Sequence, residues 1–276
     1  MKLKNKNALV AGATRGIGRA IARSLAAGGV RLILPWHDDW LEDAKSLQDE
    51  LACSKTGHIF IKSDLRNQCD VDNMAETIKK KTGTLHILIN NIERGGMPVV
   101  HGSYDRELNR EQWQLELETT LLAKRLVFEA CLPLLKKAEQ ASVINISSIA
   151  GITGRSGPAG LLFSDGYAAA NRGIGSLTET WARIGAPSVR VNELMLGLID
   201  TRHGKKTRGW QTLSPAQKKQ LRDHTLLGRT GTTKEVVETI LFLLRKGDFM
   251  TGATLRLDGG FVLGGENTPP MPDGIL

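Results

Sequence analysis

The sequence contains few cysteines and histidines, and none of them is spaced for metal binding. Its 276 residues include three cysteines, Cys53, Cys69 and Cys131, and six histidines that occur singly. Protein zinc sites use paired ligands a few residues apart, and disulfide frameworks use an even number of cysteines. We therefore predict no structural or catalytic metal, and we expect the cysteines to be reduced thiols in the core.

Long hydrophobic runs are also absent. The first six residues are basic, like the start of a signal peptide, but the apolar run that follows covers only residues 8–11 before Gly12 interrupts it. Signal peptides need a longer apolar run, and a membrane span needs about 20 apolar residues. The sequence therefore predicts a cytoplasmic protein that makes no membrane contact.

Aromatic residues form only 5% of the chain, and neither an internal repeat nor a low-complexity linker is present. Short apolar runs rich in β-branched residues recur instead, at residues 30–34, 58–61, 85–89, 143–146 and 189–191. Helical stretches separate these runs. This alternation is typical of a parallel sheet with helices on both faces. The prediction is a single-domain α/β fold with a doubly wound parallel sheet, which the length allows.

A glycine-rich turn follows the first apolar run and precedes a helical pattern. The turn consists of Gly12, Ala13, Thr14, Arg15, Gly16, Ile17 and Gly18. Backbone N–H groups at the start of a helix bind phosphate, and glycines let the phosphate approach the backbone. An ordinary strand-to-helix turn can contain glycines too. The strand and helix patterns on either side favour a phosphate-binding turn.

Positive charge is in excess, with a formal net charge of +8 and a sequence pI of about 9.5. The basic residues are densest between Arg202 and Arg222. We considered a nucleic-acid site, but no nucleic-acid-binding module accompanies this segment, and such a run is more often a solvated helix face. We expect no nucleic-acid partner.

Several sequence blocks together resemble the short-chain dehydrogenase/reductase family. In the family's order they are Gly12–Gly18, Leu88–Asn91, Ile144–Gly151, Tyr167–Ala170, Val191–Asn192 and Leu257–Gly260. The likeness covers residues 5–263, and the chain is similar to the 3-oxoacyl carrier-protein reductase and hydroxysteroid dehydrogenase type. It implies one NAD(P)-binding Rossmann domain over residues 1–263, including a substrate lid at about residues 198–225, and a C-terminal tail over residues 264–276.

The resemblance also implies which residues contact the cofactor. They are Gly12, Thr14, Arg15, Gly16, Ile17 and Gly18 at the pyrophosphate, Asp64 and Leu65 at the adenine, Asn90 at the adenosine ribose, Asn171 at the other ribose, and Gly197 in the loop that closes over the nicotinamide. The family's Ala-Gly after the second asparagine is replaced by Ile92 and Glu93, so we expect an altered wall beside the nicotinamide ribose.

Cofactor choice depends on the end of the second strand, where an acidic residue would bind the ribose hydroxyls of NAD. Trp36 and His37 stand there, and Arg15 could pair with a 2′-phosphate. These residues favour NADP. A shift of one or two residues in the comparison would make Asp38 the ribose ligand, and NAD would then be preferred.

The catalytic residues implied by the resemblance are Tyr167, as proton donor or acceptor, and Ser148, which would hold the substrate oxygen. Two further positions depart from the family. Asn171 replaces the lysine that lowers the phenol pKa, and Thr120 replaces an asparagine that supports a proton relay. Arg172 is no substitute, because one helical step turns a side chain about 100° away.

Two classes of function follow. The first is an NAD(P)-dependent oxidoreductase that transfers hydride between the nicotinamide and a carbonyl or secondary alcohol. Its small-molecule substrate would be anionic or an acyl thioester, attracted by the basic lid. The second is a cofactor-binding homologue with impaired catalysis, serving as a structural or regulatory subunit of a hetero-oligomer with an active relative.

We also expect a homodimer or homotetramer. Relatives assemble through two long helices, here about residues 110–136 and 166–185. Apolar contacts could come from Leu115, Leu121, Leu122, Leu126 and Trp181, although ordinary core packing explains much of this pattern equally well. Between Ser148 and Tyr167 lies an insertion rich in glycine and proline that could supply an apolar wall beside the active site.

Overall fold

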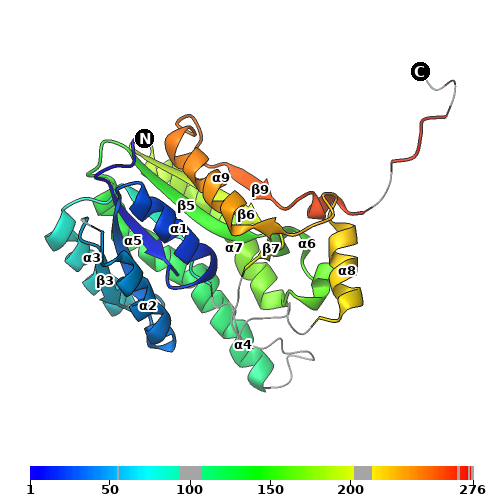
Figure 1. Cartoon of the computed structure of the whole chain (residues 1–276), viewed down its shortest axis with the longest axis horizontal. Coiled ribbons are helices and arrows are strands. Elements are labelled where there is room, and N and C mark those ends of the chain that lie inside the picture. Colours follow the sequence, from blue (N-terminus) through cyan, green and yellow to red (C-terminus); the bar gives the residue numbers. More distant parts are fainter. Residues whose placement is uncertain (55, 94–106, 202–212, 266–267, 273, 275–276) are drawn as a thin grey trace.

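A seven-stranded parallel sheet forms the centre of the molecule (Figure 1). The computed structural model describes residues 1–54, 56–93, 107–201, 213–265, 268–272 and 274. Across the sheet the strands are β3 (Ile59–Lys62), β2 (Arg31–Trp36), β1 (Asn7–Ala11), β4 (Ile87–Asn90), β5 (Ala141–Ser148), β6 (Val189–Leu196) and β9 (Thr254–Leu257). All strands run parallel, and the order in which the chain adds strands to the sheet reverses between β1 and β4. Ligands of open α/β sheets bind at such a point.

Helices cover both faces of the sheet. One face packs against α1 (Gly16–Ala27), α2 (Leu41–Leu51) and α9 (Thr233–Arg245), and the other against α3 (Gln68–Thr82), α5 (Ala123–Leu135) and α7 (Asp165–Gly185). Alternate strand residues enter opposite cores, as Leu9 and Val10 do in β1. Strands buried on both faces need continuous apolar runs, so the predicted doubly wound Rossmann fold is confirmed.

The helix that follows β4 contains a π-helical turn. It starts as α4 (Glu107–Leu117), continues through the π turn η2 (Glu118–Leu122) and ends as α5. Such single π turns insert one residue into a helix and frequently occur at functional sites. Both Thr119 and Thr120 are buried within this turn.

Smaller elements lie around the carboxyl end of the sheet. They are η1 (Asp38–Trp40), α6 (Ala150–Thr153), η3 (Pro158–Leu161), β7 (Ile199–Asp200), α8 (Pro215–His224), β8 (Gly231–Thr232) and η4 (Phe261–Leu263). A third core includes Leu221 of α8 and Phe261 of η4, and Leu161, Leu162 and Phe163 of the insertion pack against this core. The insertion therefore has an apolar anchor.

Some expectations about individual side chains are wrong. Cys131 is buried, but Cys53 and Cys69 are exposed because neither faces a core. Leu126 and Trp181 cannot supply subunit contacts, because both are packed inside the main core, where Trp181 stacks on Phe128 at a ring distance of 4.2 Å. Their apolar character serves the interior of the chain.

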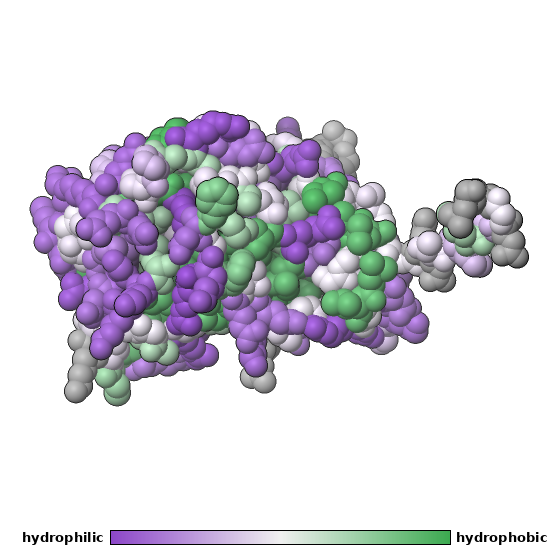
Figure 2. All heavy atoms as spheres, turned by 90° about the horizontal axis from the view of Figure 1, so that it is seen from above, coloured by the Kyte–Doolittle hydropathy of each residue, from purple (hydrophilic) through white to green (hydrophobic). Residues whose placement is uncertain are grey.

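The end of the described chain leads away from the body of the molecule (Figure 1). Apolar side chains gather on the upper face near the base of this segment (Figure 2). Within the described ranges, no helix combines the length and apolarity that a membrane crossing requires, and no cluster of three metal-binding side chains occurs. The boundary between a domain over residues 1–263 and a C-terminal tail over residues 264–276 stays a prediction.

Candidate active site

The turn between β1 and α1 forms a cradle that only glycine can line. A Cβ atom on Gly18 would lie 1.9 Å from the Gly12 carbonyl oxygen, and one on Gly12 would lie 2.7 Å from the Asn91 carbonyl oxygen. Gly12 also has a φ of +68°, which side chains disfavour. The bare backbone leaves the first turn of α1 open, where N–H groups and the helix dipole attract phosphate. This geometry fits a dinucleotide pyrophosphate.

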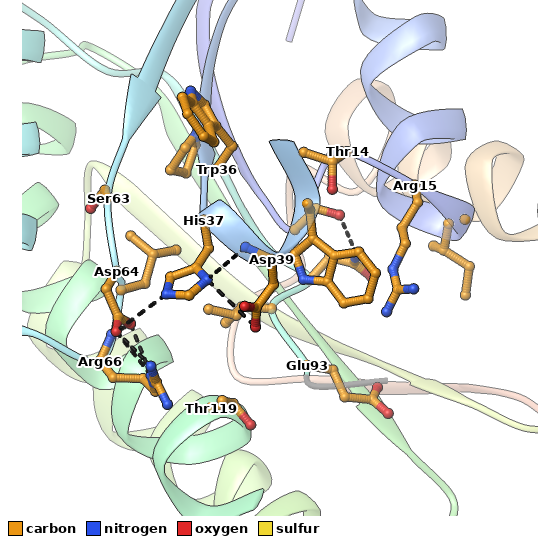
Figure 3. A pocket seen from close by; sticks show the side chains of 18 residues that line it. Thr14, Arg15, Trp36, His37, Asp39, Ser63, Asp64, Arg66, Glu93 and Thr119 are labelled. Carbon is orange, nitrogen blue, oxygen red and sulfur yellow. Dashed lines mark hydrogen bonds and ion pairs between the residues drawn. The ribbon is translucent and has the colours of Figure 1, made fainter. Parts of the chain in front are cut away.

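A pocket of about 190 Å³ extends from this cradle across the carboxyl ends of β1, β2 and β4 (Figure 3). It is lined by Gly12, Thr14, Arg15, Gly16, Ile17, Pro35, Trp36, His37, Asp39, Trp40, Ser63, Asp64, Leu65, Arg66, Asn91, Ile92, Glu93 and Thr119. Nine of the cofactor-binding residues expected from the sequence are in this set. Gly18, Asn90, Asn171 and Gly197 are not.

Asn90 lies behind the pocket. Its side chain is fully buried and donates to Asn145 Oδ1 at 3.0 Å, and Asn145 in turn donates to Thr178 Oγ1 at 2.9 Å. Asn91 lines the pocket instead, and its side-chain amide donates to the Gly12 carbonyl. The first asparagine therefore ties β4 to β5 and α7, and the second holds the glycine cradle.

The end of β2 presents Trp36 and His37 to the pocket, as the sequence suggested. Asp38, the alternative ribose ligand, points elsewhere and pairs with Lys62 at 2.7 Å. Asp39, the next residue, does line the pocket, where its carboxylate lies 3.6 Å from His37 Nδ1. The sequence comparison missed Asp39 because a 3₁₀ turn follows the strand directly.

Arg15 lies flat over the Trp40 ring, with its Cζ atom 3.4 Å from the ring centroid. This cation–π contact orients the guanidinium at the rim of the pocket. Burial lowers the pKa of Arg15, while the charges of Asp43 and Glu93 raise it. Because the unperturbed pKa is so high, the guanidinium stays charged. Trp40 had no sequence signal as a pocket residue.

Asp64 is held by Arg66, which the sequence comparison also missed. The guanidinium donates to both carboxylate oxygens, with Nε 2.9 Å from Oδ1 and one terminal nitrogen 2.6 Å from Oδ2. These hydrogen bonds lower the pKa of Asp64. The carboxylate is therefore ionised, and it neutralises Arg66 at this side of the pocket.

Ser148 and Tyr167 come from adjacent elements. Ser148 ends β5, and its buried Oγ accepts a hydrogen bond from the Ala150 N–H at 3.2 Å. This bond leaves the serine O–H able to donate to a substrate oxygen. Tyr167 lies in the first turn of α7, which Ser164 caps, and its ring packs 5.8 Å from that of Phe163.

The side chains of Asn171 and Thr120, the two positions that depart from the family, are uncharged. The Asn171 side chain is buried, and its amide turns back along α7 to donate to the Tyr167 carbonyl at 2.9 Å. Arg172 is exposed on another side of the helix, as expected. Thr120 is also buried, and its Oγ1 has no hydrogen-bond partner among the described residues.

A buried lysine, Lys124, lies one helical turn after Thr120. Its ammonium donates to the Ile92 carbonyl at 2.7 Å and to the Thr120 carbonyl at 3.0 Å. Burial lowers the pKa of Lys124 to about 8, although the charges of Glu93 and Glu193 oppose this shift. No sequence pattern distinguishes Lys124, because a single lysine within a helical pattern normally faces solvent.

Glu193 is a second buried charge. It lies on β6, where Ser147 donates to its Oε1 and Thr254 donates to its Oε2 at 2.6 Å. Its exposed fraction is 1%. Since buried charges are costly unless they are paired or hydrogen-bonded, these hydroxyls and the attraction to Lys124 explain how the carboxylate is tolerated.

We call Gly12, Gly16, Gly18 and the first turn of α1 the phosphate end, and Ile92, Thr120, Ser148, Tyr167 and Asn171 the catalytic end. Gly197 lies beside the catalytic end, where a Cβ atom would meet Asp258 Cα at 2.6 Å. The basic residues Lys205, Lys206 and Arg208 of the expected lid lie outside the described residues, whereas Lys218, Lys219 and Arg222 belong to α8.

Comparison with known proteins identifies the family. A family model described as Enoyl-(Acyl carrier protein) reductase matches residues 12–262. The chain belongs to the short-chain dehydrogenase/reductase family. It is 29% identical over 262 residues to 3-oxoacyl-[acyl-carrier-protein] reductase from Bos taurus, covering 94% of this chain and 99% of the relative. It is 28% identical to the FabG reductase from Escherichia coli, covering 95% of this chain and all of that relative.

Solved structures agree on the fold. The chain superposes on a short-chain dehydrogenase/reductase from Brucella melitensis with a TM-score of 0.78 and 24% identity, covering 94% of this chain and 98% of that one. For the ligand-free aldohexose dehydrogenase of Thermoplasma acidophilum the TM-score is 0.73, the identity 22%, and the coverage 98% of each chain. The family assignment confirms the expected general function, an NAD(P)-dependent oxidoreductase, over the non-catalytic alternative.

Proposed function

We propose that this protein reduces the ketone carbonyl of an oxoacyl thioester to a secondary alcohol, with NADPH as the hydride donor. The observation that carries the cofactor choice is Arg15, which Trp40 holds at the rim of the pocket, 3.4 Å from its ring. A guanidinium recognises a phosphate in a bidentate manner. Asp38 is the ribose ligand for NAD that the sequence offered after β2, and its carboxylate is paired with Lys62.

The pocket residues fit the cofactor. The backbone of Gly12 and Gly16 and the first turn of α1 would hold the pyrophosphate, and Asp64 and Leu65 would border the adenine. Bound NADPH would supply the hydride to the carbonyl carbon.

The catalytic end performs the proton chemistry of the reaction. The Ser148 hydroxyl donates to the carbonyl oxygen and holds it, and the Tyr167 phenol gives its proton to the same oxygen as the alcohol forms. In the oxidation direction the phenolate takes the proton back. Phe163, which packs beside Tyr167, provides an apolar surface for the acyl chain.

The relatives support the substrate class. Two of them are named 3-oxoacyl-[acyl-carrier-protein] reductases, and a carrier-bound thioester has a phosphate in its linker arm. The basic residues between Arg202 and Arg222 would attract such an anionic arm. We further propose that the protein acts in the cytoplasm as a homodimer or homotetramer through α4, α5 and α7, which chromatography coupled to light scattering would test.

A titration followed by a rate measurement tests this function. Purified protein is titrated with NADPH and NADH while the nicotinamide fluorescence is recorded, and then assayed with acetoacetyl-coenzyme A. We expect preferential binding of NADPH and measurable reduction. Tyr167→Phe should lose at least about a hundredfold in turnover and retain NADPH binding.

The other outcomes are equally informative. Tighter binding of NADH would overturn the assignment of Arg15 and make Asp39 the ribose ligand. Binding of NADPH without reduction of any carbonyl would point to the non-catalytic subunit, alone or paired with an active relative. Equal turnover by Tyr167→Phe and the wild type would refute the proton-transfer step.

A further inference from the structure

Lys124 is the candidate for a cation at the catalytic end. Neither Asn171, which is uncharged, nor Arg172, which is exposed, can bring positive charge to this region. Lys124 is the one lysine or arginine that is buried within the described part of the chain, with an exposed fraction of 2%. A buried ammonium is expensive to maintain. A lysine buried at this position therefore needs an explanation in the function of the site.

The contacts of Lys124 join two parts of the pocket wall. Ile92, whose carbonyl accepts at 2.7 Å, lines the pocket directly after β4. Thr120, whose carbonyl accepts at 3.0 Å, follows the pocket residue Thr119 in the π turn. The ammonium therefore spans the loop after β4 and the π turn.

Two polar groups at this point have hydrogen-bonding capacity that the described residues do not use. An ammonium has three N–H donors, and two of those of Lys124 are accounted for. The buried Oγ1 of Thr120 is the other group. Buried polar groups are nearly always satisfied, so both are suited to a ligand or an ordered water in the pocket.

The π turn also lies against the helix that carries Tyr167 and Asn171. A Cβ atom on Gly173 would lie 3.1 Å from Leu121, and one on Gly166 would lie 3.1 Å from Trp113. The small residues of α7 thus allow close contact with the helix of Lys124.

We propose that Lys124 is the cation of the catalytic end, a positioning residue that fixes the Ile92 and Thr120 carbonyls and supplies from α5 the positive charge missing at position 171. This inference rests on the proposed function for its catalytic meaning, but its effect on nucleotide binding does not. The charged groups that act on the ammonium are Glu93 after β4 and Glu193 on β6. Since the pKa of Lys124 is about 8, its charge is present at neutral pH and lost above it.

The test is the pH dependence of NADPH binding. The dissociation constant is measured by nicotinamide fluorescence from about pH 6 to about pH 10 for the wild type, Lys124→Met, Asn171→Lys and the double variant. Lys137→Met, at an exposed lysine just beyond α5, is the matched control. Circular dichroism spectra establish that each variant is folded.

We expect wild-type binding to weaken by about tenfold as the pH passes 8, because a charge-assisted hydrogen bond is lost. Lys124→Met should bind about tenfold more weakly at neutral pH and should lack this transition. Adding Asn171→Lys should restore the affinity of Lys124→Met, with a transition nearer the ordinary lysine pKa of about 10.4. Lys137→Met should behave as the wild type does.

Turnover gives the second readout, measured over the same pH range with acetoacetyl-coenzyme A. A fall in kcat near pH 8 that is absent in Lys124→Met and moves toward pH 10 in the double variant supports the proposal. An unchanged pH transition in Lys124→Met, or failure of Asn171→Lys to rescue a folded Lys124→Met, overturns it. If Lys124→Met does not fold, the comparison of the wild type with Asn171→Lys decides. A lysine at 171 that titrates near its ordinary pKa of about 10.4 should keep NADPH binding strong above pH 8, and a fall at pH 8 as large as in the wild type overturns the proposal.

The proposal and the proposed function fail in different ways. A binding transition near pH 8 without any carbonyl reduction refutes the function and leaves Lys124 as the cation of the pocket. Carbonyl reduction without a pH transition in binding or turnover refutes the role of Lys124 and leaves the function intact.

Discussion

The phosphate end and the catalytic end of the site depend on different parts of the chain. At the phosphate end the determinants are backbone atoms, since Gly12 and Gly18 leave no room for a Cβ atom and the N–H groups of α1 face the pocket. At the catalytic end the determinants are charges and hydroxyls, and two of the four expected residues, Asn171 and Thr120, are substituted. Backbone cradles tolerate little change, whereas a charge can be supplied from a neighbouring helix.

The largest effect we predict is at the phosphate end. Gly18→Ala would place a Cβ atom 1.9 Å from the Gly12 carbonyl oxygen, so the cradle must shift. We expect NADPH binding to weaken by about a hundredfold or more and stability to fall by roughly 1–3 kcal/mol. Gly28→Ala, at the other end of α1, is the control, because its Cβ would be 3.3 Å from the nearest atom. Normal nucleotide binding by Gly18→Ala would show that the cradle does not hold the cofactor.

The next prediction concerns the stability of the catalytic end. The pKa of Lys124 is about 8 in the folded protein, against 10.5 as its ordinary value. Below pH 8 the lysine is charged in both states, so the folded protein bears the whole cost of burying it. Between pH 8 and pH 10.5 the unfolded chain binds more protons, so wild-type stability rises relative to Lys124→Met, by up to about 3 kcal/mol.

Denaturant unfolding of the two proteins at a series of pH values measures this difference. Lys137→Met, the exposed counterpart, should run parallel to the wild type throughout. Parallel curves for Lys124→Met as well would mean that the buried ammonium does not titrate in this range.

The difference between the phosphate end and the catalytic end also explains which features could be predicted from the sequence. The doubly wound sheet followed from apolar runs, and the cradle followed from Gly12, Gly16 and Gly18, because backbone geometry restricts the residue type. Lys124 could not be predicted, since its burial depends on how α5 packs against the sheet. Trp40 and Arg66 were missed for a similar reason: their contacts with Arg15 and Asp64 depend on the conformation of turns.

A smaller effect should appear where the phosphate end meets β2. Arg15→Gln removes the guanidinium over Trp40 and should weaken NADPH binding by about tenfold while leaving NADH binding within about twofold, because only NADPH has the 2′-phosphate. Arg23→Gln, on the helix that Arg15 precedes and paired with Glu50, should change neither. Equal losses for both nucleotides would assign Arg15 to the shared pyrophosphate.

The smallest effect tests how the catalytic end tolerates its buried charge. Glu193 raises the pKa of Lys124, so Glu193→Gln should lower the pH midpoint of NADPH binding by roughly half a unit. Glu129→Gln, on the exposed side of α5 beside Arg125, should leave the midpoint unchanged. A midpoint that does not respond to Glu193→Gln would mean that Ser147 and Thr254 screen this carboxylate from Lys124. The two buried charges would then be independent, and Glu93 would be the main carboxylate acting on Lys124.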